Sequence, residues 1–194
     1  IVGSLPALFG DTAVTRYQLT TSYRSTKEIT DFANQFLSHE DTVEMTARTG
    51  DLPRLVRGGS NAENLLTLTG ILEAERATAK YWRTAIICKT TEECQALYDQ
   101  LEPAFQKEIQ LIVSEDDFMK RNIMIIPAFL AKGLEFDRVF AWNINENFTT
   151  QQDRLILYTI CTRAMHQLTL FTTITESPLL QQANPLTYQL MTAN

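Results

Sequence analysis

At its centre the chain reads Ala131-Lys132-Gly133-Leu134-Glu135-Phe136, between the apolar runs 123–126 and 139–142. This pattern predicts a strand, a tight turn that contains Gly133, and a second strand. A glycine in such a turn permits a positive φ and lets a ligand approach the backbone closely. Glu135 beside it is placed to accept a hydrogen bond from a sugar hydroxyl. The alternative is an ordinary loop with one exposed charge of each sign.

Strands and helices alternate on both sides of this stretch. The run 84–88 is apolar at nearly every position, which is typical of a strand buried on both faces of a parallel sheet. Ser25, Ser60 and Thr90 are each followed three residues later by Glu, which predicts three capped helices. Further strands are expected at 17–19, 53–56, 109–113, 122–126, 139–142 and 166–173, and further helices at 150–163 and after Asn184. The pattern predicts one α/β domain with a mainly parallel sheet flanked by helices, preceded by a lead-in over 1–14.

Composition excludes several classes of protein. The 194 residues suffice for one large domain, and their net charge of −6 does not suit a general polyanion-binding module. Cys88, Cys94 and Cys161 have no CxxC spacing, which argues for a reducing compartment and against a disulfide framework or a zinc site. No apolar run approaches membrane-spanning length. Because position 1 is Ile, we expect the chain to be a piece of a longer protein.

A second stretch with chemical potential is Leu19-Thr20-Thr21-Ser22-Tyr23-Arg24-Ser25-Thr26, between a predicted strand and a capped helix. An arginine at the carboxyl end of a strand can present its planar five-donor fork to a phosphate. Tyr23 offers a flat face on which a base can stack. The alternative is a surface arginine beside a core tyrosine.

A third stretch is Tyr158-Thr159-Ile160-Cys161-Thr162-Arg163-Ala164, where a predicted helix leads into a strand. We expect Arg163 at the ligand-binding edge of the sheet. The alternative is a charge at a helix C-terminus that interacts with the macrodipole.

Taken together, the three stretches resemble the C-terminal motor domain of superfamily 1 helicases of the UvrD, Rep and PcrA kind. Tyr23-Arg24-Ser25-Thr26 matches motif IV of that family, 131–136 matches motif V, and Thr162-Arg163-Ala164 matches motif VI. The resemblance runs from residue 19 to residue 170. It implies a second RecA-like domain over 1–194, with three layers and a fold related to the P-loop NTPases.

The resemblance also implies a role for each matched residue. Tyr23 would stack on the adenine of ATP, and Arg24 and Arg163 would act as arginine fingers on the γ-phosphate. Glu135 would accept a hydrogen bond from the ribose, and Gly133 would admit the nucleotide. Such roles suit phosphoryl transfer, in which catalysis is mainly positioning and electrostatic stabilisation.

No glycine of the chain is followed by lysine, so the sequence contains no GxxxxGK[ST] phosphate loop. The resemblance implies that ATP and Mg²⁺ are held by an N-terminal RecA-like motor domain of the same parent protein. We therefore expect this chain alone neither to hydrolyse ATP nor to bind it tightly.

Three departures from the family narrow the interpretation. Pro127 and Phe129 stand where DNA-unwinding members usually have Thr and His, and Asp153 stands where motif VI often has a second arginine. The interval between motifs IV and V is also too short for the long inserted domain that is often present there. These features look most like the HelD-type branch, whose members remodel and recycle bacterial RNA polymerase.

Three hypotheses follow: a helicase or translocase motor half that acts on DNA, a HelD-type motor half that acts on RNA polymerase, and a degenerate structural module. Retention of Arg24, Glu135 and Arg163 argues against the third. Either motor reading implies a cytoplasmic, bacterial protein with no membrane partner.

Overall fold

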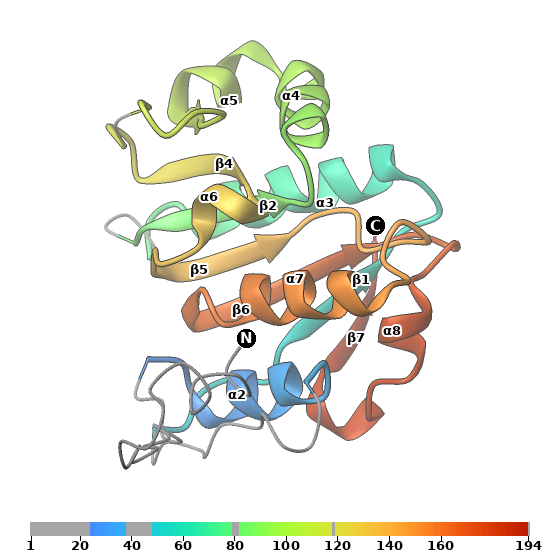
Figure 1. Ribbon diagram of the computed structural model, residues 1–194. Helices are drawn as coiled ribbons and strands as arrows, with labels where there is room; N and C mark the ends of the chain where they lie inside the picture. The colour runs from blue at the N-terminus through green and yellow to red at the C-terminus, as the bar shows by residue number, and fades with distance from the viewer. Residues whose placement is uncertain (1–23, 38–47, 79–81, 118, 194) are drawn as a thin grey trace, which may run out of the picture.

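The structure is a computed structural model that describes residues 24–37, 48–78, 82–117 and 119–193. Within these ranges, one seven-stranded sheet has the order β3-β4-β2-β5-β6-β1-β7 (Figure 1). Every recorded pair of neighbouring strands is parallel, which confirms the predicted α/β class. The strands are β1 (Arg54–Arg57), β2 (Thr84–Cys88), β3 (Ile109–Leu111), β4 (Ile123–Pro127), β5 (Phe136–Ala141), β6 (Ala164–Thr172) and β7 (Gln189–Thr192).

Helices cover both faces of the sheet, which gives a three-layer RecA-like arrangement (Figure 1). One face packs against α2 (Lys27–Asn34), α6 (Ala128–Ala131), α7 (Gln151–Cys161) and α8 (Pro178–Gln181). The other face packs against α3 (Asn61–Ala74), α4 (Thr91–Gln100) and α5 (Pro103–Glu108). A short 3₁₀ helix, η2 (Pro185–Thr187), precedes β7.

The interior strand β2 shows why the apolar run 84–88 predicts a parallel sheet. All five of its residues are buried, and Ala85 and Ile87 contribute to one core while Ile86 and Cys88 contribute to the other. A strand covered by helices on both sides has no polar face, so it reads as continuous hydrophobic sequence.

Two of the three predicted helix starts are confirmed, and one is displaced. The side chains of Ser60 and Thr90 accept hydrogen bonds from the backbone N–H groups three residues on. The predicted capping box of Ser25 and Glu28 is wrong, because Thr26 is the N-cap of α2. Glu28 instead accepts a hydrogen bond from the Gly50 backbone, 2.7 Å away.

Several elements escape the sequence pattern. The helices α5, α6 and α8 and the edge strand β7 were not predicted, and each has six residues or fewer. A single helical turn, α6, therefore lies between β4 and the glycine turn where a direct strand–turn–strand connection is expected. The predicted strand 17–19 and the lead-in over 1–14 lie outside the described residues.

Candidate functional site

Three of the predicted site residues meet at the amino ends of β5 and β6. Glu135 immediately precedes β5, and Arg163 immediately precedes β6. Arg24, from the segment before α2, places its Nε 2.6 Å from Oε1 of Glu135. Arg163 therefore lies at the amino edge of the sheet, where α7 leads into β6, and the expectation that this edge binds a ligand stays a prediction. Tyr23 lies outside the described residues.

Backbone contacts join the glycine turn to the start of β6. Gly133 has a φ of 87°, as the turn pattern predicts. The Leu134 N–H donates to the Ala131 carbonyl at 3.1 Å, which closes the turn. The Phe136 N–H then donates to the Arg163 carbonyl at 2.9 Å. Residues about thirty positions apart in sequence are thereby held in one fixed register.

The Arg163 guanidinium is oriented by acceptors from two elements. Its Nη1 donates to the Leu134 carbonyl and its Nε to the Thr159 carbonyl, both at 3.1 Å. Its Nη2 donates to Thr162 Oγ1 at 3.3 Å. Partial burial lowers the pKa of Arg163, the charge of Arg24 lowers it further, and Glu135 opposes both. The group remains a cation whose orientation is set before any ligand arrives.

Ser25 ties the Arg24 segment to the Arg163 segment. Its Oγ donates to the Ala164 carbonyl at 2.7 Å, and the side chain is buried. Serine is a common N-cap residue, but the Ser25 hydroxyl instead joins the segment before α2 to the start of β6. Nothing in the local sequence indicates this, because the carbonyl that it reaches is 139 residues away.

Two guanidinium groups and one carboxylate thus share a small region, with an excess of positive charge. Arg24 is exposed over 60% of its side chain and Glu135 over 36%, so both remain accessible to a ligand. The donor set suits an anion such as a phosphate group, and the carboxylate suits a hydroxyl donor. This combination fits a nucleoside polyphosphate.

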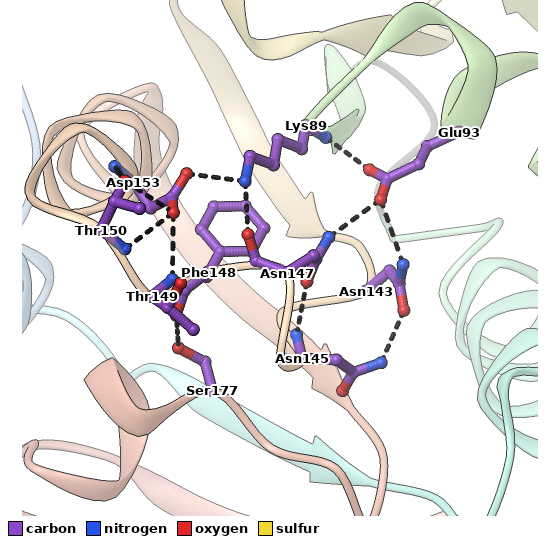
Figure 2. A network of polar contacts seen from close by, with 10 residues as sticks. All are labelled: Lys89, Glu93, Asn143, Asn145, Asn147, Phe148, Thr149, Thr150, Asp153 and Ser177. Carbon is purple, nitrogen blue, oxygen red and sulfur yellow. Dashed lines mark hydrogen bonds and ion pairs between the residues drawn. The ribbon is translucent and has the colours of Figure 1, made fainter.

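A second polar cluster, which the sequence reasoning did not identify as a unit, lies at the opposite, carboxyl edge of the sheet (Figure 2). Nζ of Lys89, which follows β2, lies 2.6 Å from Oδ1 of Asp153 in the first turn of α7. Lys89 Nζ also donates to the Asn147 carbonyl and lies 4.9 Å from the centre of the Phe148 ring. A lysine directly after a fully buried strand was the available sequence signal.

Glu93 completes this cluster from the first turn of α4. Its carboxylate accepts from the Lys89 backbone N–H at 2.9 Å, from Asn147 Nδ2 at 2.9 Å and from Asn143 Nδ2 at 3.2 Å. Asn143 has a φ of 58°, a left-handed conformation that Asn tolerates better than most residues. The cluster therefore fixes the loop between β5 and α7, and α7 carries Arg163 just beyond its other end.

Asp153 is the most strongly perturbed carboxyl in this cluster. Burial by itself would raise its pKa, but the hydrogen bond from Lys89 and those from Thr149 and Thr150 hold the pKa well below its ordinary value of 3.8. The Thr150 side chain and Asp153 also form a reciprocal capping box at the start of α7. Asp153 is consequently ionised wherever the protein is folded at ordinary pH.

No helix in the described part of the chain is both long and apolar enough to span a membrane. Nor do the residues that the structure places include a group of three or more His, Cys, Asp or Glu side chains that could hold a metal ion.

The chain has a relative among solved structures. No protein-family model and no curated protein sequence matches the chain. Among solved structures, the chain is similar to the crystal structure of the C-terminal domain of a possible DNA helicase from Lactobacillus plantarum WCFS1. The two share 38% sequence identity with a TM-score of 0.71, over 87% of this chain and 98% of that chain. The chain therefore belongs to the family of helicase C-terminal domains.

Proposed function

We propose that this chain is the C-terminal motor domain of an ATP-dependent superfamily 1 helicase or translocase of the UvrD and Rep kind. In this proposal Arg24 and Arg163 contact the γ-phosphate of ATP that is bound on an N-terminal motor domain of the parent protein. The observation that carries the proposal is the convergence of Arg24, Glu135 and Arg163, which belong to three separate motifs, at one edge of the sheet.

Arg163 suits the role of an arginine finger because its orientation is already set. Three of its nitrogen atoms are held by Thr159, Thr162 and Leu134. Electrostatic stabilisation is most effective when the donor needs no reorganisation during the reaction. An arginine delivered to the γ-phosphate from a second domain or protein is worth about 10³–10⁵ in rate in well-studied NTPases.

Arg24 must exchange one partner for another when the nucleotide enters. In the structure it pairs with Glu135 at 2.6 Å, and both side chains are partly exposed. Exposed ion pairs are worth only about 0–1 kcal/mol, so a phosphate can displace the carboxylate easily. Glu135 is then free to accept a hydrogen bond from the ribose, and Tyr23 supplies the stacking face for the adenine.

ATP and Mg²⁺ belong to the complete two-domain motor in this proposal. The Mg²⁺ ion, held by the N-terminal motor domain, would neutralise phosphate charge, and this chain would supply the cations that sense the γ-phosphate. Hydrolysis would then control closure of the two domains, so the chain alone is expected to be inactive.

A specific observation favours the alternative, a HelD-type motor that acts on RNA polymerase. Phe129 is 62% exposed and Leu155 is 50% exposed. Both line a hollow of about 320 Å³ with Lys89, Lys132 and Ile156. An apolar surface of this kind suits contact with a protein more than contact with a phosphate backbone.

The test uses the full-length parent protein and measures ATP hydrolysis. Arg163→Ala should lower kcat by about a thousandfold. Arg154→Ala is the matched control, because Arg154 lies at the other end of α7 and contacts Gln182. If the Arg163→Ala variant hydrolyses ATP as fast as the wild type, the arginine-finger proposal is refuted.

The same parent protein separates DNA from RNA polymerase as the target. If ATP drives release of RNA polymerase, and the wild type never unwinds a tailed duplex, the HelD-type alternative stands. Robust unwinding of the duplex would exclude the HelD-type alternative and support a motor that acts on DNA.

A further inference from the structure

A cavity lies on the face of the sheet opposite to α2 and α7, where α3 and α5 end. Its volume is about 450 Å³, within the usual range for small-molecule sites. The first residues of β2 and β4, Thr84 and Ile123, form part of its wall. Its lining includes none of Arg24, Glu135 and Arg163, so it is separate from the proposed nucleotide contacts.

The lining is strongly cationic although the chain has a net charge of −6. Two carboxylates, Glu75 and Glu108, line it together with five cationic side chains: Arg76, Lys107, Lys120, Arg121 and Arg138. Arg76 pairs with Glu108 at 3.0 Å. No ion pair among the described residues involves Lys107 or Lys120, so their charges remain uncompensated by a direct partner.

Arg121, in the lining of this cavity, is held in place. Its Nη1 donates to the Gln106 and Ile109 carbonyls, each at 2.9 Å. Gln110 Oε1 accepts from the backbone N–H groups of Lys120 at 2.8 Å and of Arg121 at 3.3 Å. Since these contacts fix the turn, two cations are presented side by side before a ligand binds.

The wall of the cavity contains buried polar atoms that lack a hydrogen-bond partner in the described part of the chain. Arg138 is 3% exposed and Thr84 is 1% exposed. Arg138 Nε and Thr84 Oγ1 have no hydrogen-bond partner in the described part of the chain. Arg138 also shares one carboxylate, Glu75, with Arg54, so two guanidinium groups are balanced by a single negative charge. Buried polar groups in native proteins are nearly always satisfied, which makes these atoms informative.

Apolar side chains complete the wall. Leu72, Phe105 and Ile123 contribute aliphatic and aromatic surface, and Trp82 lines the cavity beside them. The Trp82 ring stacks on His166 with a centroid distance of 5.6 Å, so its position is supported from behind. Partly apolar walls and several cations around one cavity are typical of a small-molecule site. A surface that binds a nucleic-acid backbone is usually an open, positively charged groove.

We propose that this cavity binds a small molecule that carries a diphosphate or longer phosphate group. Lys107, Lys120 and Arg121 contact the phosphate oxygens, and the charge of the buried Arg138 in the wall adds to the positive potential. Phosphate is favoured because several fixed cations converge, and arginine matches its oxygens with two parallel hydrogen bonds.

The test uses the 194-residue chain and measures binding of inorganic pyrophosphate and tripolyphosphate by calorimetry. Lys107→Gln combined with Lys120→Gln should weaken binding by about tenfold or more, because two charge-assisted contacts are lost. The control combines Lys132→Gln with Arg154→Gln, which removes the same total charge outside the cavity. The control should bind as the wild type does, and Arg163→Ala tests whether the probe binds at the proposed nucleotide contacts instead.

Each other result would overturn the proposal. No binding of either probe by the wild type would exclude the site. If Lys107→Gln with Lys120→Gln and the control lose the same amount of affinity, net charge alone attracts the anion. Loss only in Arg163→Ala would place the phosphate at the proposed nucleotide contacts. Binding of a single-stranded oligonucleotide, but of neither small probe, would make the cationic lining a nucleic-acid surface.

Discussion

Lys89 Nζ lies 2.6 Å from Asp153 Oδ1, in a pair whose side chains are 22% and 7% exposed. The pair joins the end of β2 to the first turn of α7. Removal of the carboxylate leaves a partly buried ammonium and frees the Thr149 and Thr150 N–H groups. We therefore expect Asp153→Ala to lower the free energy of unfolding by about 3 kcal/mol at pH 7, by urea denaturation. Asp116→Ala, at an exposed turn, is the control and should be nearly neutral.

Acid should weaken the same pair. The folded-state pKa of Asp153 is lowered from 3.8, so the pair contributes its full stabilisation above that value and loses it as the pH falls below. The difference in unfolding free energy between wild type and Asp153→Ala should therefore be constant from neutral pH to about pH 5 and shrink at lower pH. If the difference in unfolding free energy instead grows as the pH falls, the pKa of Asp153 is not lowered by folding.

Gly133 and Gly70 form a pair of glycines for which substitution by alanine should have opposite effects. A Cβ at either position meets no atom within 4 Å, so space does not decide the outcome. Gly133 has a φ of 87°, and alanine there should cost about 1–2 kcal/mol in backbone strain. Gly70 lies inside α3, where alanine should stabilise by about 0.5–1 kcal/mol. Thermal unfolding of the two variants measures both signs, and equal signs would refute the backbone explanation.

Ser25 and Thr26 are adjacent but should differ in function. Ser25→Ala removes the contact with the Ala164 carbonyl, and Thr26→Ala removes the cap of α2. Each should cost about 1 kcal/mol of stability. If Ser25 positions Arg24 next to Arg163, only Ser25→Ala should also lower ATP turnover by the parent protein. Equal turnover in the two variants would limit Ser25 to a structural role.

Thr84→Val should stabilise the free chain. The Thr84 hydroxyl is buried and has no hydrogen-bond partner among the residues that the structure describes, and valine keeps the branched shape. Because an unsatisfied buried group costs about 1–3 kcal/mol, its removal should raise Tm. A lower Tm would show that the hydroxyl is satisfied in solution, and the argument from unpaired atoms in the cavity would fail.

Local sequence predicted what depends on near neighbours. The continuous apolar run 84–88 predicted a doubly covered strand, and Ser60 and Thr90 predicted the starts of α3 and α4. Gly133 predicted a positive φ. Each of these features is decided within a few residues, by side-chain burial along one strand, by a hydrogen bond to the third residue, or by the absence of a Cβ.

Sequence by itself thus determined the α/β class and named Arg24, Glu135 and Arg163, because periodicity and motif residues can be read along the chain. Only the tertiary structure decided that Arg24 pairs with Glu135, that Ser25 holds Ala164 rather than capping a helix, and that cations surround a cavity beneath α3 and α5. These arrangements join residues far apart in sequence, and the competition between a local and a distant hydrogen-bond partner is settled by packing.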